Sequence, residues 1–135
     1  MAKSVAKDSR ITEPRVDHAA ALRLFQAVAQ AWGLTQEERR ILLGGVSAST
    51  YADWTSGRHR PRLSIDTLER IGNLVAIRDN LHALFSMAPE RADSWVKRGN
   101  AALGGRTALD VMRSGHLPAI VDVRRYLDAQ IAPWG

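Results

Sequence analysis

The chain has 135 residues, of which 45% are hydrophobic and 24% charged, a composition that folds around a core. Its length suits one domain or two small helical subdomains and excludes an enzyme with separate cofactor and substrate lobes. The absence of cysteine excludes disulfides, thiolate metal sites and cysteine nucleophiles. We find no signal-peptide core in residues 1–15 and no membrane-spanning stretch, and therefore expect a cytoplasmic protein.

The charge balance favours a polyanionic partner. Nineteen basic and 14 acidic residues give a net charge of +5, which is typical of nucleic-acid binding without proving it. Residues 1–62 carry 10 basic and 6 acidic side chains (+4), whereas residues 63–135 carry 9 and 8 (+1). The polar residues 1–15 have no hydrophobic period and predict a flexible arm, which is either only solvated or contacts DNA.

The first predicted helix covers residues 16–32 and ends at Gly33. Apolar residues recur there at steps of three and four, as on one face of a helix: Leu22, Phe25, Ala29 and Trp32. Leu24 and Val28 are expected to widen this buried stripe.

The next segment predicts two short helices joined by a tight turn. Thr35-Gln-Glu-Glu38 is a capping box that begins the second helix, and Gly44-Gly45 must end it. Ser47 can cap a third helix over residues 48–56, which Gly57 terminates. This layout is that of a helix-turn-helix.

The third helix is expected to have an inner and an outer side. Val46, Tyr51 and Trp54 lie at the spacing that locks it onto the second helix. The outer side, which would face the major groove, consists of Ser47, Ala48, Ser49, Ala52 and Asp53. It has no Arg, Gln or Asn for bidentate base contacts, so we expect modest base specificity.

A basic loop follows the third helix and is suited to phosphate anchoring. Its candidate residues are Arg58, His59, Arg60 and Arg62. A merely solvated basic loop is the alternative. Asp53 would repel phosphate, so we expect it to pair with one of these arginines.

The remainder also has helical patterns. Ser64 caps a long helix that carries Ile65, Leu68, Ile71, Val75, Leu81, Leu84 and Phe85, with a break expected near residues 77–80. Pro89 begins a short helix that lasts until Gly99 and has Ala92, Trp95 and Val96 on its apolar side.

A glycine-rich turn at residues 99–105 precedes a helix over 108–114, for which Thr107 and Asp110 form a capping pair. Pro118 opens a last helix with Ile120, Val121, Tyr126 and Leu127, and residues 131–135 form a non-helical tail. No alternating run of β-branched residues occurs, so the predicted fold is all-α.

Enzymatic chemistry has little support. The chain contains no GxGxxG, GxxxxGK[ST], HExxH or GxSxG motif, and its four histidines are never at metal-ligand spacing. We therefore predict no catalytic group, no metal and no cofactor. The glycines before Arg106 can either cradle an anion or form a tight turn between two helices, and the second use is favoured.

The C-terminal half carries a family resemblance. WVKRGNAALGGRTALDVMRSG, residues 95–115, resembles the signature of the Xre/MbcA/ParS antitoxin family, and residues 34–85 are similar to the helix-turn-helix half of those proteins. The resemblance implies an antitoxin that silences a RES-domain toxin, which degrades NAD or uses it for ADP-ribosylation. It also implies repression of its own operon, commonly as a homodimer on operator DNA.

The resemblance divides the chain into an arm (1–15), a helix-turn-helix domain (16–88) and a toxin-binding domain (89–135). The positions that match the family signature are Trp95, Asn100, Leu103, Gly104, Gly105, Arg106, Thr107, Leu109, Asp110 and Gly115. Leu103, Leu109 and Gly115 are better explained by packing and helix ends. The toxin contacts that we predict are Trp95, Asn100, Gly104, Gly105, Arg106, Thr107, Ile131, Trp134 and Gly135.

The tail residues are included because Pro133 stops the helix and leaves Trp134 on a short tether beside the terminal carboxylate of Gly135. A ring and an anion suit a pocket made for NAD. The alternative is that Trp134 folds back on the last helix. For the whole protein, the alternative is a helix-turn-helix regulator whose C-terminal domain dimerises or senses a ligand.

Overall fold

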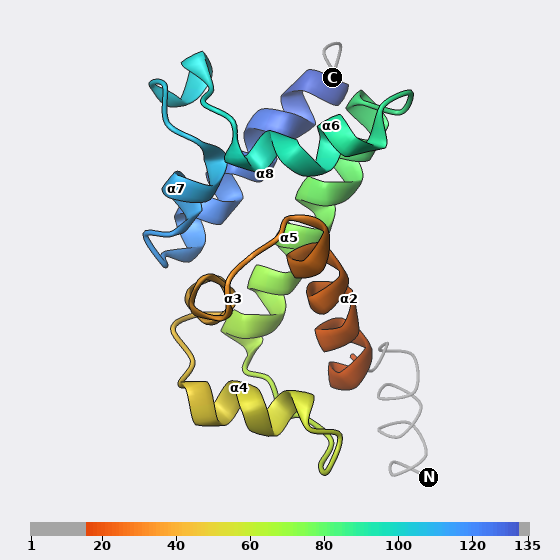
Figure 1. The fold of residues 1–135 in the computed structure, drawn as a ribbon, viewed down its shortest axis with the longest axis vertical. Helices are drawn as coiled ribbons and strands as arrows, with labels where there is room; N and C mark the ends of the chain where they lie inside the picture. Colours follow the sequence, from red (N-terminus) through yellow and green to blue (C-terminus); the bar gives the residue numbers. More distant parts are fainter. Residues whose placement is uncertain (1–15, 133–135) are drawn as a thin grey trace, which may run out of the picture.

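The structure, a computed structural model, describes residues 16–132. Over this range it contains helices and no strand, which confirms the all-α prediction (Figure 1). The α-helices are α2 (His18–Ala31), α3 (Gln36–Leu42), α4 (Ala48–Thr55), α5 (Ile65–Leu84), α6 (Pro89–Ser94), α7 (Ala108–Met112) and α8 (Leu117–Ile131). Two 3₁₀ turns, η1 (Trp95–Lys97) and η2 (Ala101–Leu103), lie between α6 and α7. The predicted arm lies outside the described residues.

The long helix α5 is the centre of the fold. It packs against α2 on the N-terminal side and against α8 and α6 on the C-terminal side (Figure 1). Phe25 of α2, Leu74 and Ile77 of α5, and Ile120 of α8 are completely buried in one hydrophobic cluster. The two halves of the chain therefore share a core, and α4 and α6 lie toward opposite ends of the molecule.

Helix α5 runs without interruption, so the expected break near residues 77–80 is wrong. Ile77 and Leu81 are completely buried and keep the apolar stripe continuous. The amide nitrogen of Asn80 donates to a carboxylate oxygen of Asp128 on α8 at 2.7 Å, and Arg78 pairs with Asp93 at 3.2 Å. The polar residues that suggested a break are thus used in contacts between helices.

Local capping explains where most helices begin. In the predicted capping box, Glu38 N–H donates to Thr35 Oγ1 at 3.0 Å and Thr35 N–H donates to Glu38 Oε1 at 2.9 Å. The caps expected at Ser47, Ser64 and Thr107 are confirmed. Asp17 caps α2 by accepting from Ala20 N–H, so this helix begins at His18.

The turn between α3 and α4 is held by α5. Gly44 has φ +110°, and a side chain there would come within 3.2 Å of the Asp66 carboxylate and 3.3 Å of Arg70 Nε. Thr67 Oγ1 donates to the Leu43 carbonyl at 3.0 Å. The positive φ therefore favours glycine at this position, and a side chain there would also have to displace the Asp66–Arg70 pair slightly.

Four apolar residues lie differently from the expectation. Leu24 is 55% exposed, because it is rotated by about 200° from Leu22 around α2. Ile65, in the first turn of α5, is 76% exposed, and Leu84 at the other end is 38% exposed. Ile131 is the last residue of α8 and not part of a non-helical tail. Helices at their ends and outer faces thus expose residues that a simple apolar count assigns to the core.

Candidate functional sites

Among residues 16–132, no other helix covers the outer face of α4, which lies at one end of the molecule (Figure 1). The five predicted groove-facing residues are all exposed: Ser47, Ala48, Ser49, Ala52 and Asp53. On the opposite side, Tyr51 is buried, and Val46 and Trp54 are half-buried against the core. The predicted inner and outer sides of this helix are therefore confirmed, while base contact by the outer residues stays a prediction.

Ser47 is occupied by its capping role. Its Oγ accepts from Thr50 N–H at 3.1 Å, donates to Thr50 Oγ1 at 2.9 Å and lies 3.1 Å from Ser49 Oγ. A hydroxyl held in this way is a weaker reader of base edges, so the face offers chiefly Ser49 and the methyl groups of Ala48 and Ala52. Such contacts are suited to fitting a groove rather than to strict base selection.

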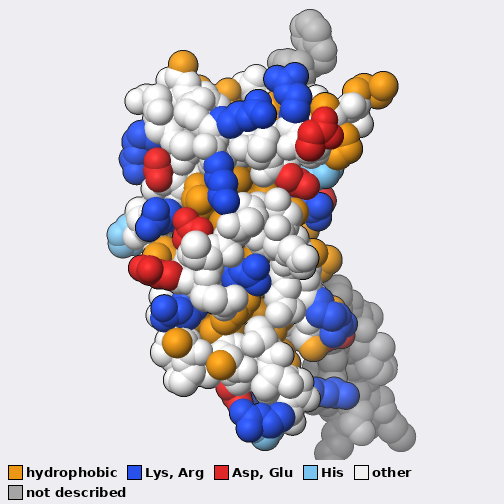
Figure 2. All heavy atoms as spheres, viewed as in Figure 1, with side chains coloured by type: hydrophobic (Ala, Val, Ile, Leu, Met, Phe, Trp, Pro, Cys, Tyr) orange, Lys and Arg blue, Asp and Glu red, His pale blue; other side chains and the backbone are white. Residues whose placement is uncertain are grey.

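The loop after α4 presents a set of exposed basic side chains. Arg58, His59, Arg60 and Arg62 are all exposed, and none of them forms an ion pair with another described residue. The expected pairing of Asp53 with one of these arginines is not found among residues 16–132. In Figure 2, Lys and Arg side chains are visible at the end of the molecule that carries α4.

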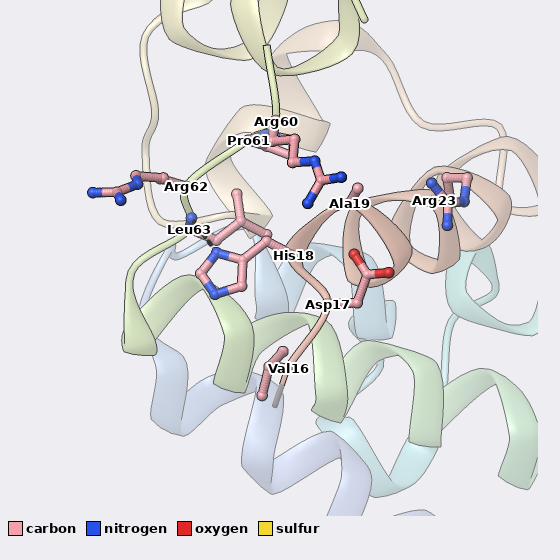
Figure 3. A pocket seen from close by; sticks show the side chains of 9 residues that line it. All are labelled: Val16, Asp17, His18, Ala19, Arg23, Arg60, Pro61, Arg62 and Leu63. Atoms are coloured by element: carbon pink, nitrogen blue, oxygen red, sulfur yellow. Dashed lines mark hydrogen bonds between the residues drawn. The ribbon is translucent and has the colours of Figure 1, made fainter. Parts of the chain in front are cut away.

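The basic loop is fastened to the start of α2. Leu63 N–H donates to Nδ1 of His18 at 2.9 Å, and a hollow of about 1180 Å³ opens between the two segments. Figure 3 shows Arg60 reaching toward the side of α2 and Arg62 pointing away from it. Arg23 of α2 also lines this hollow.

Sequence reasoning missed Arg23 and His18 because they are distant in the chain from the basic loop. The available signal was weak: Ala19, Arg23 and Gln26 recur at positions that share one face of α2. No local motif indicates which segment lies against that face.

The glycine-rich turn is closed by its own hydrogen bonds. Asn100 N–H donates to the Arg106 carbonyl at 3.0 Å, and Gly105 N–H donates to the Asn100 carbonyl at 2.9 Å. Gly104 and Arg106 N–H groups also donate to carbonyls of the turn, those of Ala101 and Leu103. Because these donors are used internally, a tight turn is better supported here than an anion cradle.

Glycine at position 99 allows the turn to close. A side chain there would lie 3.1 Å from the carbonyl oxygen of Gly105, and Gly99 forms an isolated β-bridge with Thr107. Thr107 Oγ1 accepts from Asp110 N–H at 2.9 Å, and the Arg106 guanidinium donates to the Asp110 carbonyl at 3.2 Å. The turn and the start of α7 therefore form one ordered unit.

Most predicted toxin contacts lie on or beside this turn, which projects from the half of the molecule opposite α4 (Figure 1). Gly104, Gly105 and Arg106 are exposed, whereas Asn100 and Thr107 are half-buried. Trp95 is half-buried and stacks on Tyr126 of α8, with ring centroids 6.4 Å apart and planes inclined by 13°. Ile131 is 39% exposed, and Trp134 and Gly135 lie outside the described residues.

A charged cluster fastens α6 to α5. Asp93 Oδ1 lies 2.8 Å from His82 Nε2 and 3.2 Å from Arg78 Nε. Burial raises the pKa of the Asp93 carboxyl, but the hydrogen bonds and charges of His82 and Arg78 outweigh it and hold the pKa below 3.8. This histidine therefore has a structural partner on the neighbouring helix.

Neither a metal site nor a membrane span is present in the described part of the chain. Between residues 16 and 132, no three His, Asp or Glu side chains are grouped so that they could hold a metal ion. None of the helices in this range is long and apolar enough to cross a membrane.

Comparison with known proteins gives consistent results. Residues 13–76 match the model of the antitoxin Xre-like helix-turn-helix domain, and residues 80–130 match that of the antitoxin Xre/MbcA/ParS C-terminal toxin-binding domain. The chain is also 38% identical over 111 residues to the uncharacterized protein y4oB of Sinorhizobium fredii (strain NBRC 101917 / NGR234), covering 82% of this chain and 84% of that protein. Antitoxins of this kind are generally not enzymes. The chain therefore belongs to the Xre/MbcA/ParS antitoxin family, with a helix-turn-helix domain followed by a toxin-binding domain.

Proposed function

We propose that this antitoxin neutralises a RES-domain toxin that uses NAD, and that it represses its own operon by binding operator DNA as a homodimer. The toxin either degrades NAD or transfers ADP-ribose from it. The observation that carries the proposal is the pairing of an exposed helix-turn-helix face at one end of the fold with a toxin-binding domain at the other.

The proposed toxin contacts combine an ordered turn with a helix end. Trp95, Asn100, Gly104, Gly105, Arg106 and Thr107 would anchor the toxin, and Ile131, Trp134 and Gly135 would cover its NAD pocket. The exposed Arg106 and the stacked Trp95 support the anchor, since cationic and aromatic side chains are common at the centre of interfaces. The aromatic ring of Trp134 would enter a pocket that accepts NAD.

The proposed DNA contacts combine the outer face of α4 with the exposed basic loop. Ser49, Ala48 and Ala52 would lie in the major groove. Arg58, His59, Arg60 and Arg62 would contact backbone phosphates on its flank. Their exposure and the absence of ion pairs to other described residues support this assignment.

Co-expression with the neighbouring open reading frame tests the toxin assignment. The neighbour alone should stop growth and lower cellular NAD or ADP-ribosylate a target, and this antitoxin should restore growth and co-purify with it. A neighbour that leaves growth and NAD unchanged and does not co-purify would favour the alternative of a plain transcriptional regulator.

Truncation after Ala129 tests the occlusion mechanism. Because the anchor lies upstream, the shortened antitoxin should still form the complex but only partly suppress toxicity. The full chain at equal expression is the control. Complete suppression by the shortened chain would show that the tail is dispensable.

A further inference from the structure

Helix α2 presents a polar face to the basic loop, although it lies outside the helix-turn-helix pair. Ala19, Arg23 and Gln26 are spaced by four and three residues and so share one side of the helix. All three line a hollow together with the end of α4 and the loop after it. The DNA-facing end of the molecule is therefore wider than α4 and the basic loop alone.

This smaller hollow, of about 400 Å³, is strongly basic. Three arginines line it, namely Arg23, Arg58 and Arg60, and no carboxylate is among its lining residues. None of the three forms an ion pair with another residue in the described range. Three positive charges around one small space repel each other and favour an anionic occupant.

The position of the hollow indicates which anion it would bind. Trp54 and Thr55, at the C-terminal end of α4, also line it. When a recognition helix lies in the major groove, the sugar–phosphate backbone passes along the flanks of that helix. A duplex placed on α4 would therefore bring a phosphate group next to this hollow.

The larger hollow beside the loop is less suited to phosphate. It is also lined by three arginines, Arg23, Arg60 and Arg62, but it contains Asp17 as well, whose carboxylate accepts from Ala20 N–H at 3.1 Å. This negative charge would oppose a phosphate there. The smaller hollow is thus the better phosphate position.

We propose that Arg23 and Gln26 of α2 form part of the DNA interface and bind a backbone phosphate together with Arg58 and Arg60. Arg23 supplies charge and a forked donor group, and the Gln26 amide supplies a neutral donor. The contact reads no bases, so it acts equally on operator and unrelated DNA. This inference rests on the DNA binding that is proposed above.

Salt-dependent binding of the Arg23→Ala variant tests the inference. The probes are a duplex from the promoter of the antitoxin's own gene and a scrambled duplex of equal length, titrated between about 50 and 200 mM salt. The slope of log K against log salt is negative, and removing one phosphate contact should reduce its magnitude by about 0.9. Binding to both duplexes should weaken roughly fivefold near 0.15 M salt.

Two further variants separate charge from shape. Arg23→Lys should retain the wild-type slope, because it keeps the positive charge. Gln26→Glu should weaken binding to both duplexes, because it places a negative charge in the hollow. The matched control is Arg125→Ala, which removes one exposed arginine from α8 and should leave both the slope and the affinity unchanged.

A reference variant distinguishes this inference from the proposed function. Replacing Arg58, Arg60 and Arg62 together by Ala should flatten the slope more than Arg23→Ala does. One outcome is that the triple variant loses affinity for DNA while Arg23→Ala binds as Arg125→Ala does. That result would contradict the proposed phosphate contact of α2 but would agree with the proposed DNA binding. If the triple variant also binds normally, the proposed DNA interface itself is wrong.

Discussion

The two ends of the molecule are held in different ways. In α4 only Tyr51 is buried, and the helix is positioned by a cap at Ser47 and by the glycine turn that α5 supports. In α8, Ile120, Val123 and Leu127 are buried, and the helix packs along α5. Helix α4 is therefore positioned by a local turn and by Tyr51 and Trp54 on its inner side, whereas α8 is held by packing along α5.

Among residues 16–132, most of the surface of α4 remains exposed. Helix α8 instead contacts the region beside the exposed turn, where its Tyr126 stacks on Trp95. Because both ends share α5, a change in the core should affect both functions. A change on one surface should affect only one.

The largest effect is expected from a core change in α5. Leu74 is completely buried, so Leu74→Ala should lower the free energy of unfolding by roughly 2–5 kcal/mol and impair DNA binding and toxin neutralisation together. Urea unfolding measures this change. Ile65→Ala, on the exposed side of the same helix, is the control and should change stability by less than about 0.5 kcal/mol. Loss of one function alone in Leu74→Ala would contradict a shared core.

A smaller and more local effect is expected for Trp54→Ala. Replacing a fully buried Trp by Ala lowers the free energy of unfolding by roughly 3–5 kcal/mol. Because Trp54 is only half-buried, we expect a decrease of about 2 kcal/mol. DNA binding should fall, because the inner side of α4 loses its anchor, while toxin neutralisation persists. Loss of DNA binding with an unchanged free energy of unfolding would show that Trp54 contacts DNA instead.

The smallest effect is expected at the Asp93 cluster, which belongs to the C-terminal half. Asp93→Asn should lower stability near neutral pH by about 1–2 kcal/mol, since it weakens charged hydrogen bonds from Arg78 and His82. The pKa of Asp93 is lowered in the folded state, so this contribution is complete above 3.8 and disappears as the pH falls through the folded pKa.

Unfolding of the wild type and of Asp93→Asn, near neutral pH and in acid, measures the linkage. The difference in their free energies of unfolding should shrink in acid, while DNA binding near neutral pH stays the same. A difference that is independent of pH would contradict the lowered pKa.

The local structure of the first half was largely predictable because its signals are short in sequence. The Thr35 capping box, the Ser47 and Ser64 caps and the glycines at 33 and 57 each act within a few residues. By contrast, α6 and α8 lack a side-chain cap. Their starts could still be predicted, because each has a proline in its first turn.

The errors that concern the candidate site and the course of α5 came from contacts between distant residues. Asn80 favours a break until its partner Asp128, 48 positions away, is known. Arg23 gains a candidate role only when α2 is seen against the basic loop, 35 or more residues further along the chain. The exposure of the α4 face could be predicted from spacing, but the neighbours that widen this site could not.

The assignment of DNA binding and toxin neutralisation to opposite ends can be tested most directly with the triple variant that replaces Arg58, Arg60 and Arg62 by Ala. DNA affinity should fall on all sequences, with a salt slope reduced by about one unit for each phosphate that the variant no longer binds. Neutralisation of the co-expressed toxin, followed by growth and NAD level, should equal that of the wild type. An unchanged salt slope, or a loss of neutralisation in a variant that remains folded, would contradict the assignment of the two functions to opposite ends.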